Sequence, residues 1–309
     1  MASTILYKTA IMLILIGVGI LCAKTGLISK ASNRDLSKFM LQVVNPVVIF
    51  MSYQTDYRSE LVRNLLLTFV LALGTMALAI ALSYLFVRRK EGREFEIERF
   101  SSVYSNCGFM GIPLVNAIYG SEGVFYLTAY ITVFNLIVWT HGVILISGEK
   151  DFRQVVKVFY SPTIIAIFLG MITFFLRIRL PGAAAEALGL IKEVNTPMAM
   201  IVSGVTISGT NMMKMLKNHR VYYICLLKLM IVPLIISVPL SLLSEVDNTV
   251  RMTVLVAAAA PPATMCTLLS LRYGKNSIYA SEIFAAGTIL SVVTLPLIVK
   301  TTEHLTKIL

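Results

Sequence analysis

The chain has 309 residues, of which 57% are hydrophobic and only 14% are charged. Soluble domains contain roughly 45–50% apolar and about 25% charged residues, so a water-soluble core does not account for this composition. The net charge of +11 would suggest nucleic-acid binding in a soluble protein, but the Lys and Arg residues lie almost wholly between hydrophobic runs. We therefore predict an all-α integral membrane protein, in contact with the lipid bilayer and without a nucleic-acid partner.

The apolar residues form ten runs, most of them close to the ~20 residues that cross the hydrocarbon core as a helix. The first run is expected to be a helix of the mature protein, because no small-residue cleavage site follows it. The predicted membrane helices span residues 4–23, 37–53, 62–87, 99–118, 123–147, 159–177, 193–209, 221–243, 250–271 and 277–299.

Basic residues are distributed unevenly among the connections. Seventeen of the 27 Lys and Arg residues lie after the first, third, fifth, seventh and ninth predicted helices, and nine lie in the other connections and the termini. The positive-inside rule then places the odd-numbered connections in the cytoplasm and both termini outside it. We predict a multi-pass protein of the plasma membrane, with a short amphipathic stretch at 27–39 on the cytoplasmic surface.

Ten helices divide into two sets of five, and an odd number per set means that the second set is inserted upside down. Weak internal symmetry supports this division, because residues 45–46 (Asn-Pro) resemble residues 195–197 (Asn-Thr-Pro), and Pro113 corresponds to Pro262. The alternative is that proline is simply frequent in membrane helices. The predicted organisation is a first five-helix repeat at 1–147, a short cytoplasmic linker at 148–158 and a second, inverted repeat at 159–309.

The fourth and ninth predicted helices contain residues that interrupt helices. Proline removes an amide and clashes with the preceding turn, and glycine lets the chain leave helical angles. Backbone groups freed in a membrane must face protein or a wet cavity, and a half-helix that begins there directs its amides and positive dipole end into that cavity. We predict that both helices are broken and that the breaks form an anion site. The predicted break residues are Ser105, Gly111, Pro113, Pro261 and Pro262.

Neutral hydrogen-bonding side chains accompany these breaks, and no Asp or Glu lies in the middle of a predicted helix. This absence argues against a carboxylate-coordinated sodium site or proton relay and favours an anionic substrate. The alternative role for each asparagine, including Asn195, is a hydrogen bond that only joins helices. The predicted substrate-binding residues are Asn106, Cys107, Gly108, Pro262, Ala263, Thr264, Asn45, Asn135 and Thr163.

Other reactive side chains are assigned structural roles. Lys8 and Lys228 lie within a turn or two of predicted helix ends, so their ammonium groups are expected to reach the membrane surface. His141 is expected to be an interfacial group, and the four cysteines are expected to be packing residues, because no metal-binding or redox spacing occurs. No hydrolase, metalloenzyme or nucleotide-binding motif is present, so we predict no enzymatic activity, cofactor or metal.

The fourth predicted helix carries a distinctive sequence. The motif consists of residues 106–114 (Asn-Cys-Gly-Phe-Met-Gly-Ile-Pro-Leu) followed by Tyr119-Gly120. It resembles the corresponding motif of the auxin efflux carrier family, which groups plant auxin exporters with bacterial permeases for malate or malonate. The resemblance covers nearly the whole chain. Further matching segments are 135–139, 161–163, 198–200, Pro262 and 272–273.

This resemblance implies two inverted five-helix repeats, a scaffold part and a transport part, crossed fourth and ninth helices, elevator-like movement and a homodimer. By position, Asn106 matches the family's crossover asparagine, Pro262 the crossover proline, and Asn135 a support position that is Gln in the plant proteins. Ser105 replaces a proline of the plant carriers, and their Asp and Lys pair is absent from 65–86. These departures favour a compact bacterial form over an auxin exporter.

The leading hypothesis is a carrier that moves a small organic anion, a carboxylate, by alternating access. A sodium-coupled importer of the bile acid symporter type shares the inverted-repeat design and would show sodium-dependent uptake. A membrane sensor that binds the ligand without moving it would show binding and no flux.

Overall fold

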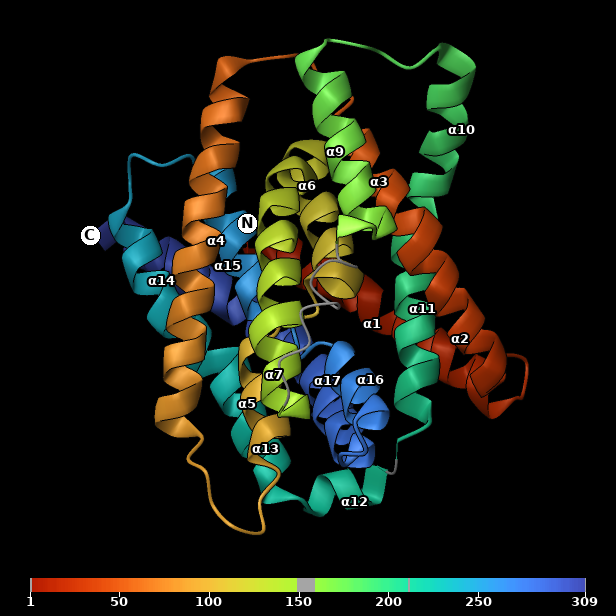
Figure 1. Cartoon of the computed structure of the whole chain (residues 1–309), viewed down its shortest axis with the longest axis vertical. Helices are drawn as coiled ribbons and strands as arrows, with labels where there is room; N and C mark the ends of the chain where they lie inside the picture. The colour runs from red at the N-terminus through yellow and green to blue at the C-terminus, as the bar shows by residue number, and fades with distance from the viewer. Residues whose placement is uncertain (1, 149–158, 211, 309) are drawn as a thin grey trace.

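The computed structural model describes residues 2–148, 159–210 and 212–308. Within these residues the regular structure is entirely helical (Figure 1), so the prediction of an all-α protein is confirmed. The α-helices are α1 (Ala2–Lys24), α2 (Lys30–Phe39), α3 (Asn45–Ser52), α4 (Ser59–Phe86), α5 (Phe95–Val103), α6 (Ile112–Ile137), α7 (Val143–Ser147), α9 (Pro162–Phe175), α10 (Gly182–Glu193), α11 (Asn195–Ser208), α12 (Met212–Lys217), α13 (His219–Leu226), α14 (Val232–Leu242), α15 (Asn248–Ala259), α16 (Met265–Arg272) and α17 (Ser277–Ile308). Four π-helical turns continue them, η1 (Met40–Val44), η2 (Cys107–Gly111), η3 (Val138–Gly142) and η4 (Leu227–Ile231).

Five helical runs among the described residues are long and apolar enough to cross a membrane. The run from Cys107 to Ser147 contains two helices, because the backbone of Gly120 turns to a φ of 62° within it. The apolar helix α9 is shorter than the other candidates. The chain is therefore a multi-pass membrane protein. The five runs are Leu6–Lys24, Ser59–Phe86, Cys107–Ser147, His219–Leu242 and Ser277–Ile308.

Each of the ten predicted membrane segments contains helix, but the boundaries differ in informative ways. The amphipathic stretch α2 continues through η1 into α3 without a break, and α17 extends to Ile308. The short helices α10 and α12 were not predicted, because a search for apolar runs of membrane-spanning length overlooks helices of 12 and 6 residues. The predicted linker lies outside the described residues from residue 149 onward.

The helices pack in two groups. The first helix group contains α1, α2, α3, α9, α10 and α11, in which α1 packs on α11 and α3 packs on α9. The second helix group contains α4 to α7 and α13 to α17, in which α4 and α15 pack on α6 and several helices pack on α17. Figure 1 shows α4, α14 and α15 on the left and α2, α10 and α11 on the right. Contacts of α3 with α6 and of α1 with α17 join the two groups.

Two glycines allow α1 and α11 to approach closely. A Cβ atom on Gly19 would lie 2.2 Å from the carbonyl oxygen of Ile201, and one on Gly204 would lie 2.1 Å from that of Ile16. Helix packing in a membrane relies on such small residues, because lipid gives no hydrophobic force to hold helices together. The first helix group is thus held by backbone-to-backbone contact.

Three of the π-helical turns end two residues before a proline. The helices that follow η1, η2 and η4 carry Pro46, Pro113 and Pro233 at their second positions. A proline ring clashes with the carbonyl group four residues earlier, and a wider turn moves that carbonyl group away. Each helix therefore continues past its proline instead of breaking.

Candidate functional site

Two of the predicted membrane segments are interrupted at the same depth of the fold. In the fourth segment, α5 ends at Val103 and helical structure resumes at Cys107. In the ninth, α15 ends at Ala259 and α16 begins at Met265. Each interruption leaves backbone amides and carbonyl groups without partners in their own helix.

The two interrupted stretches lie antiparallel and bond to each other. The amide of Asn106 donates to the carbonyl oxygen of Pro261 at 2.7 Å, and the amide of Ala263 donates to that of Tyr104 at 2.9 Å. These bonds satisfy backbone groups that lipid could not. We call this pair of stretches, residues 104–106 and 260–264, the crossover.

The predicted break residues fall into two sets. Ser105, Pro261 and Pro262 lie within the crossover. Gly111 and Pro113 lie beyond it, because the chain has already resumed helical geometry at Cys107 and the turn η2 accommodates the proline.

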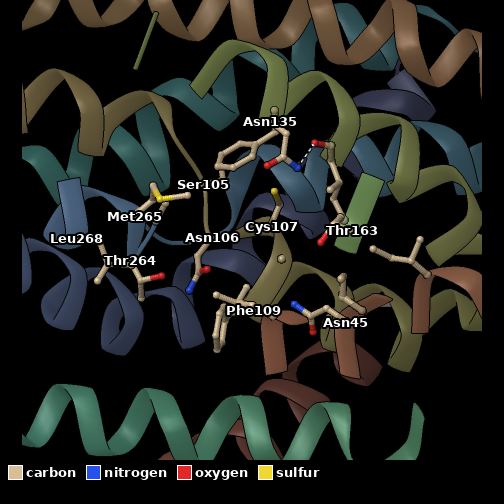
Figure 2. Close-up of a pocket in the computed structure, with 17 residues that line it drawn as sticks. Asn45, Ser105, Asn106, Cys107, Phe109, Asn135, Thr163, Thr264, Met265 and Leu268 are labelled. Atoms are coloured by element: carbon tan, nitrogen blue, oxygen red, sulfur yellow. Dashed lines mark hydrogen bonds between the residues drawn. The ribbon is translucent and has the colours of Figure 1, made fainter. Parts of the chain in front are cut away.

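A cavity of about 120 Å³ lies beside the crossover (Figure 2). Its walls come from both helix groups, with Leu41 and Ile49 on the first and Phe134 and Leu268 on the second. Eight of the nine predicted substrate-binding residues line it: Asn45, Asn106, Cys107, Gly108, Asn135, Thr163, Ala263 and Thr264. The ninth, Pro262, is not in the lining, and its ring packs against α17, where a Cβ atom on Gly287 would lie 2.5 Å from Pro262 Cδ.

Asn106 is the most informative residue of the cavity. Its side chain is 4% exposed, and its Nδ2 group has no hydrogen-bond partner among the described residues. Figure 2 shows this amide at the centre of the lining residues. A buried donor left without a partner costs about 1–3 kcal/mol, and native proteins rarely retain one without a reason. The unpaired donor is available to an acceptor from outside the chain.

The other two asparagines of the cavity are held in fixed orientations. Asn195 Nδ2 donates to Asn45 Oδ1 at 2.8 Å, and both residues are buried. This bond leaves Asn45 Nδ2 facing η2, where a Cβ atom on Gly108 would lie 3.9 Å away. Asn135 Nδ2 instead donates to the carbonyl oxygen of Ile131 in its own helix, at 2.9 Å. Asn45 therefore offers a donor near the cavity, whereas one of the two N–H groups of Asn135 is already bonded within its own helix.

The described lining residues include no Asp, Glu, Lys, Arg or His. Two helix starts supply positive potential in their place, because the helical runs that begin at Cys107 and Met265 both have their first residues in the lining. First-turn amides and the positive dipole end favour an anion at such a position. No group of three potential metal ligands occurs among the described residues. The cavity is suited to a small anion that accepts several hydrogen bonds.

Lys228 does not reach the membrane surface, so its predicted role is wrong. It lies in η4 with 1% of its side chain exposed. Its Nζ group donates to Val103 O at 3.0 Å, to Ser105 Oγ at 2.6 Å and to Ala258 O at 3.1 Å. The sequence contained the signal, because residues 221–235 are apolar or aromatic on both sides of this lysine, and an ionisable residue inside such a run is a candidate functional group.

A buried carboxylate was also missed. Glu98 of α5 is 2% exposed and accepts hydrogen bonds from Arg220 Nε at 2.9 Å and from the Tyr279 hydroxyl at 3.0 Å. These bonds tie α5 to α13 and α17 inside the second helix group. Glu98 is not part of the cavity lining.

His141 was expected to be an interfacial group, and in the structure its ring is hydrogen-bonded to two tyrosine side chains. Its Nδ1 atom lies 2.8 Å from the hydroxyl of Tyr104, and its Nε2 atom lies 3.3 Å from the hydroxyl of Tyr84. Tyr104 is the first residue of the crossover, so His141 helps to fix the point at which α5 ends.

A multi-pass helical protein with broken, crossed helices and a small cavity between two helix groups, into which a few polar side chains face, has the features of a membrane transport protein. The family described as "Membrane transport protein" matches residues 4–157 and 149–299. The chain belongs to this family, and its resemblance to auxin efflux carriers is confirmed.

Several relatives are similar over most of the chain. An "Uncharacterized transporter" of Methanothermobacter thermautotrophicus is 28% identical over 92% of this chain and 94% of its own length. A protein of Rhizobium meliloti named "Putative malonate transporter" is 26% identical over 84% of this chain and 83% of its own length. The "Uncharacterized transporter YfdV" of Escherichia coli is 22% identical over 87% of this chain and 88% of its own length.

Proposed function

We propose that this protein is a secondary transporter that moves a small carboxylate across the plasma membrane by elevator-like alternating access. The observation that carries the proposal is the buried, unpaired amide of Asn106 in a cavity at the crossover. Asn45 Nδ2 and the first amides of two helical runs supply further donors around the same space. A carboxylate has several acceptor positions and a negative charge, so it matches these groups in number and sign.

The size of the cavity favours a compact substrate. Its volume is about 120 Å³, and an apolar protein cavity of about 150 Å³ accommodates benzene. A three-carbon dicarboxylate such as malonate is close to benzene in size, whereas indole-3-acetate is far larger. The name of the Rhizobium meliloti relative points to the same class of acid. We therefore infer a short dicarboxylate as the substrate.

Two pairs of contacts support the inverted repeat of ten membrane helices. Asn45 of the first half bonds to Asn195 of the second, and Ser105 of the first half pairs with Pro262 of the second. Contacts between corresponding helices of the two halves are expected when the halves are related by an axis in the membrane plane. In this proposal the first helix group is the scaffold and the second helix group is the moving part. The homodimer follows from the family resemblance, and the placement of both termini outside follows from the distribution of basic residues.

The cavity lies on the cytoplasmic side of the crossover in this orientation. Its lining includes Thr163 at the start of α9 and Leu268 in α16, which leads to a connection that is basic and therefore cytoplasmic. On the opposite side, Tyr53 and Thr128 are joined by a hydrogen bond of 2.6 Å, and Lys192 Nζ donates to Ser121 Oγ at 2.7 Å. Both bonds join the two helix groups, which supports an inward-facing state.

Uptake into proteoliposomes tests the proposal. Radiolabelled malonate, malate and indole-3-acetate are each offered to liposomes with an imposed membrane potential, with and without sodium. Saturable, sodium-independent flux of malonate or malate, with no flux of indole-3-acetate, is the expected result. Sodium-dependent uptake would instead favour the bile acid symporter type, and binding without any flux would favour a sensor.

A further inference from the structure

We infer that Lys228 determines the anion specificity of this transporter, because its ammonium group gives the otherwise neutral crossover a net positive charge. The inference rests on the proposed function and identifies the residue that distinguishes a carboxylate from a neutral ligand of the same shape. Lys228 is not part of the cavity lining. It acts on the ligand through Ser105 and through the ends of the helices that it contacts.

The hydrogen-bond geometry around Lys228 is that of a charged ammonium group. The carbonyl oxygens of Val103 and Ala258 can only accept hydrogen bonds. The Ser105 hydroxyl donates its hydrogen to Ala258 O at 2.9 Å, so Ser105 Oγ accepts from Lys228 Nζ. Three acceptors therefore require three hydrogens on Nζ, which only the protonated amine has. The site binds the cationic form of the side chain.

The two carbonyl groups that contact Lys228 belong to helix C-terminal ends. Val103 is the last residue of α5, and Ala258 is the second-last residue of α15. Each helix end carries about half a negative charge, and each helix start about half a positive one. Without Lys228 the two C-terminal ends and the two N-terminal ends at the crossover would nearly cancel. With Lys228 bound to the C-terminal ends, the positive potential of the N-terminal ends is left for a ligand.

Ser105 connects this charge to the cavity. Its Oγ atom is 2.6 Å from Lys228 Nζ, and the same residue lines the cavity together with Asn106. The ammonium group is thus separated from the cavity by a single residue, and both Lys228 and Ser105 are buried. Electrostatic interactions are considerably stronger there than in water. Lys228 is consequently positioned to stabilise a bound anion without touching it.

A comparison of malonate with malonamide, its neutral analogue of similar shape, tests the inference. Both affinities are measured by calorimetry on the purified full-length protein for wild type, Lys228→Gln and Lys228→Arg. Gln keeps two donors for the helix ends but has no charge, and Arg keeps the charge. In Lys228→Gln we expect the affinity for malonate to fall about tenfold or more while that for malonamide changes little. Lys228→Arg is expected to retain most of the preference for malonate.

Lys300→Gln is the matched control, because Lys300 is an exposed lysine of α17 and its loss removes the same charge away from the crossover. A purely structural role for Lys228 predicts equal losses for both ligands in Lys228→Gln, and that result would overturn the inference. A double variant, Ser105→Ala with Lys228→Met, provides a second neutral form if Lys228→Gln does not fold. Equal affinity of the wild type for malonate and malonamide would also overturn it.

The same measurements separate this inference from the proposed function. Malonate flux by the wild type with an unchanged ratio of the two affinities in Lys228→Gln would leave the transporter assignment intact and reject the role of Lys228. Absence of malonate binding by the wild type would reject the proposed substrate class, and the inference with it.

Discussion

The side-chain amide of Asn195 donates a 2.8 Å hydrogen bond to the side-chain oxygen of Asn45, 150 residues earlier in the chain. Both residues are buried in the first helix group. The bond fixes which end of the Asn45 amide faces the cavity, because the oxygen is occupied and the nitrogen is left for a ligand. In the proposed function Asn195 is therefore a positioning residue, although it does not line the cavity.

Substitution of Asn195 by alanine tests this relationship. We expect Asn195→Ala to lower the affinity for malonate several-fold, because Asn45 then lacks the partner that orients it. The unfolding temperature should also fall, since a buried acceptor loses its donor at a cost of about 1–3 kcal/mol. Asn64→Ala is the control, because Asn64 is also buried and bonds to the Tyr126 hydroxyl outside the cavity. If the two variants lose the same affinity, Asn195 has no special role.

Asn106→Ala should separate affinity from stability. The affinity for malonate is expected to fall about tenfold or more, because a hydrogen bond to a charged group contributes about 1.5–3 kcal/mol. The unfolding temperature of the ligand-free protein should hold or rise, because the substitution removes a buried donor that has no partner. Calorimetry and thermal unfolding measure the two effects. Asn135→Ala should reduce affinity less, because one of the two N–H groups of Asn135 is already bonded to Ile131. Unchanged affinity in Asn106→Ala would contradict the assignment.

The contact between α1 and α11 predicts a large difference between neighbouring glycines of α1. Gly19→Ala should lower the unfolding temperature, because its Cβ atom would lie 2.2 Å from the Ile201 carbonyl oxygen, and overpacking costs about 1–3 kcal/mol. Gly17→Ala, two residues away, should be neutral or slightly stabilising, since nothing lies within 4 Å of its Cβ position. Thermal unfolding in detergent compares the two variants. Equal unfolding temperatures of the two variants would show that α1 and α11 can move apart to accommodate the added methyl group without a loss of stability.

Movement of one helix group against the other predicts that a crosslink between the groups stops transport. The first pair, Ser121→Cys and Lys192→Cys, replaces two residues that are joined by a 2.7 Å hydrogen bond between the two helix groups. The control pair, Glu96→Cys and Lys275→Cys, replaces a 3.1 Å salt bridge within the second helix group. Both pairs are made with Cys22→Ser, because Cys22 is the native cysteine that is not buried. A short bismaleimide should abolish malonate flux in the first pair and spare it in the second; equal flux in both would exclude an elevator.

Much of the helix pattern was predictable from sequence, because long apolar runs and clustered Gly and Pro have local causes. The helix breaks were expected at 105–113 and 261–262 for that reason, and the family resemblance added that the helices cross near Asn106 and Pro262. The consequence of Pro113 was not predictable in the same way, since a proline can either break a helix or follow a π-helical turn. The neighbouring helices decide between the two outcomes.

The cavity depends on packing that sequence patterns do not contain. Lys228 and helix α5 are more than 100 residues apart, and no local signal shows that the lysine contacts Val103 and Ser105. The bond between Asn45 and Asn195 depends equally on the approach of two distant helices. Residue type identified the polar side chains of the cavity lining, whereas the position of Lys228 and the orientation of the donors required the fold.

The antiparallel crossover also constrains the order in which this protein assembles in the membrane. The Ser105 hydroxyl donates to the carbonyl oxygen of Ala258, 153 residues later in the chain. The amide of Asn106 likewise donates to the carbonyl oxygen of Pro261. During synthesis the first half therefore enters the bilayer with exposed backbone groups that lipid cannot satisfy. We therefore expect the first half to be a poor candidate for independent expression. The cavity, whose walls come from both halves, can therefore form only after the second half has joined the first.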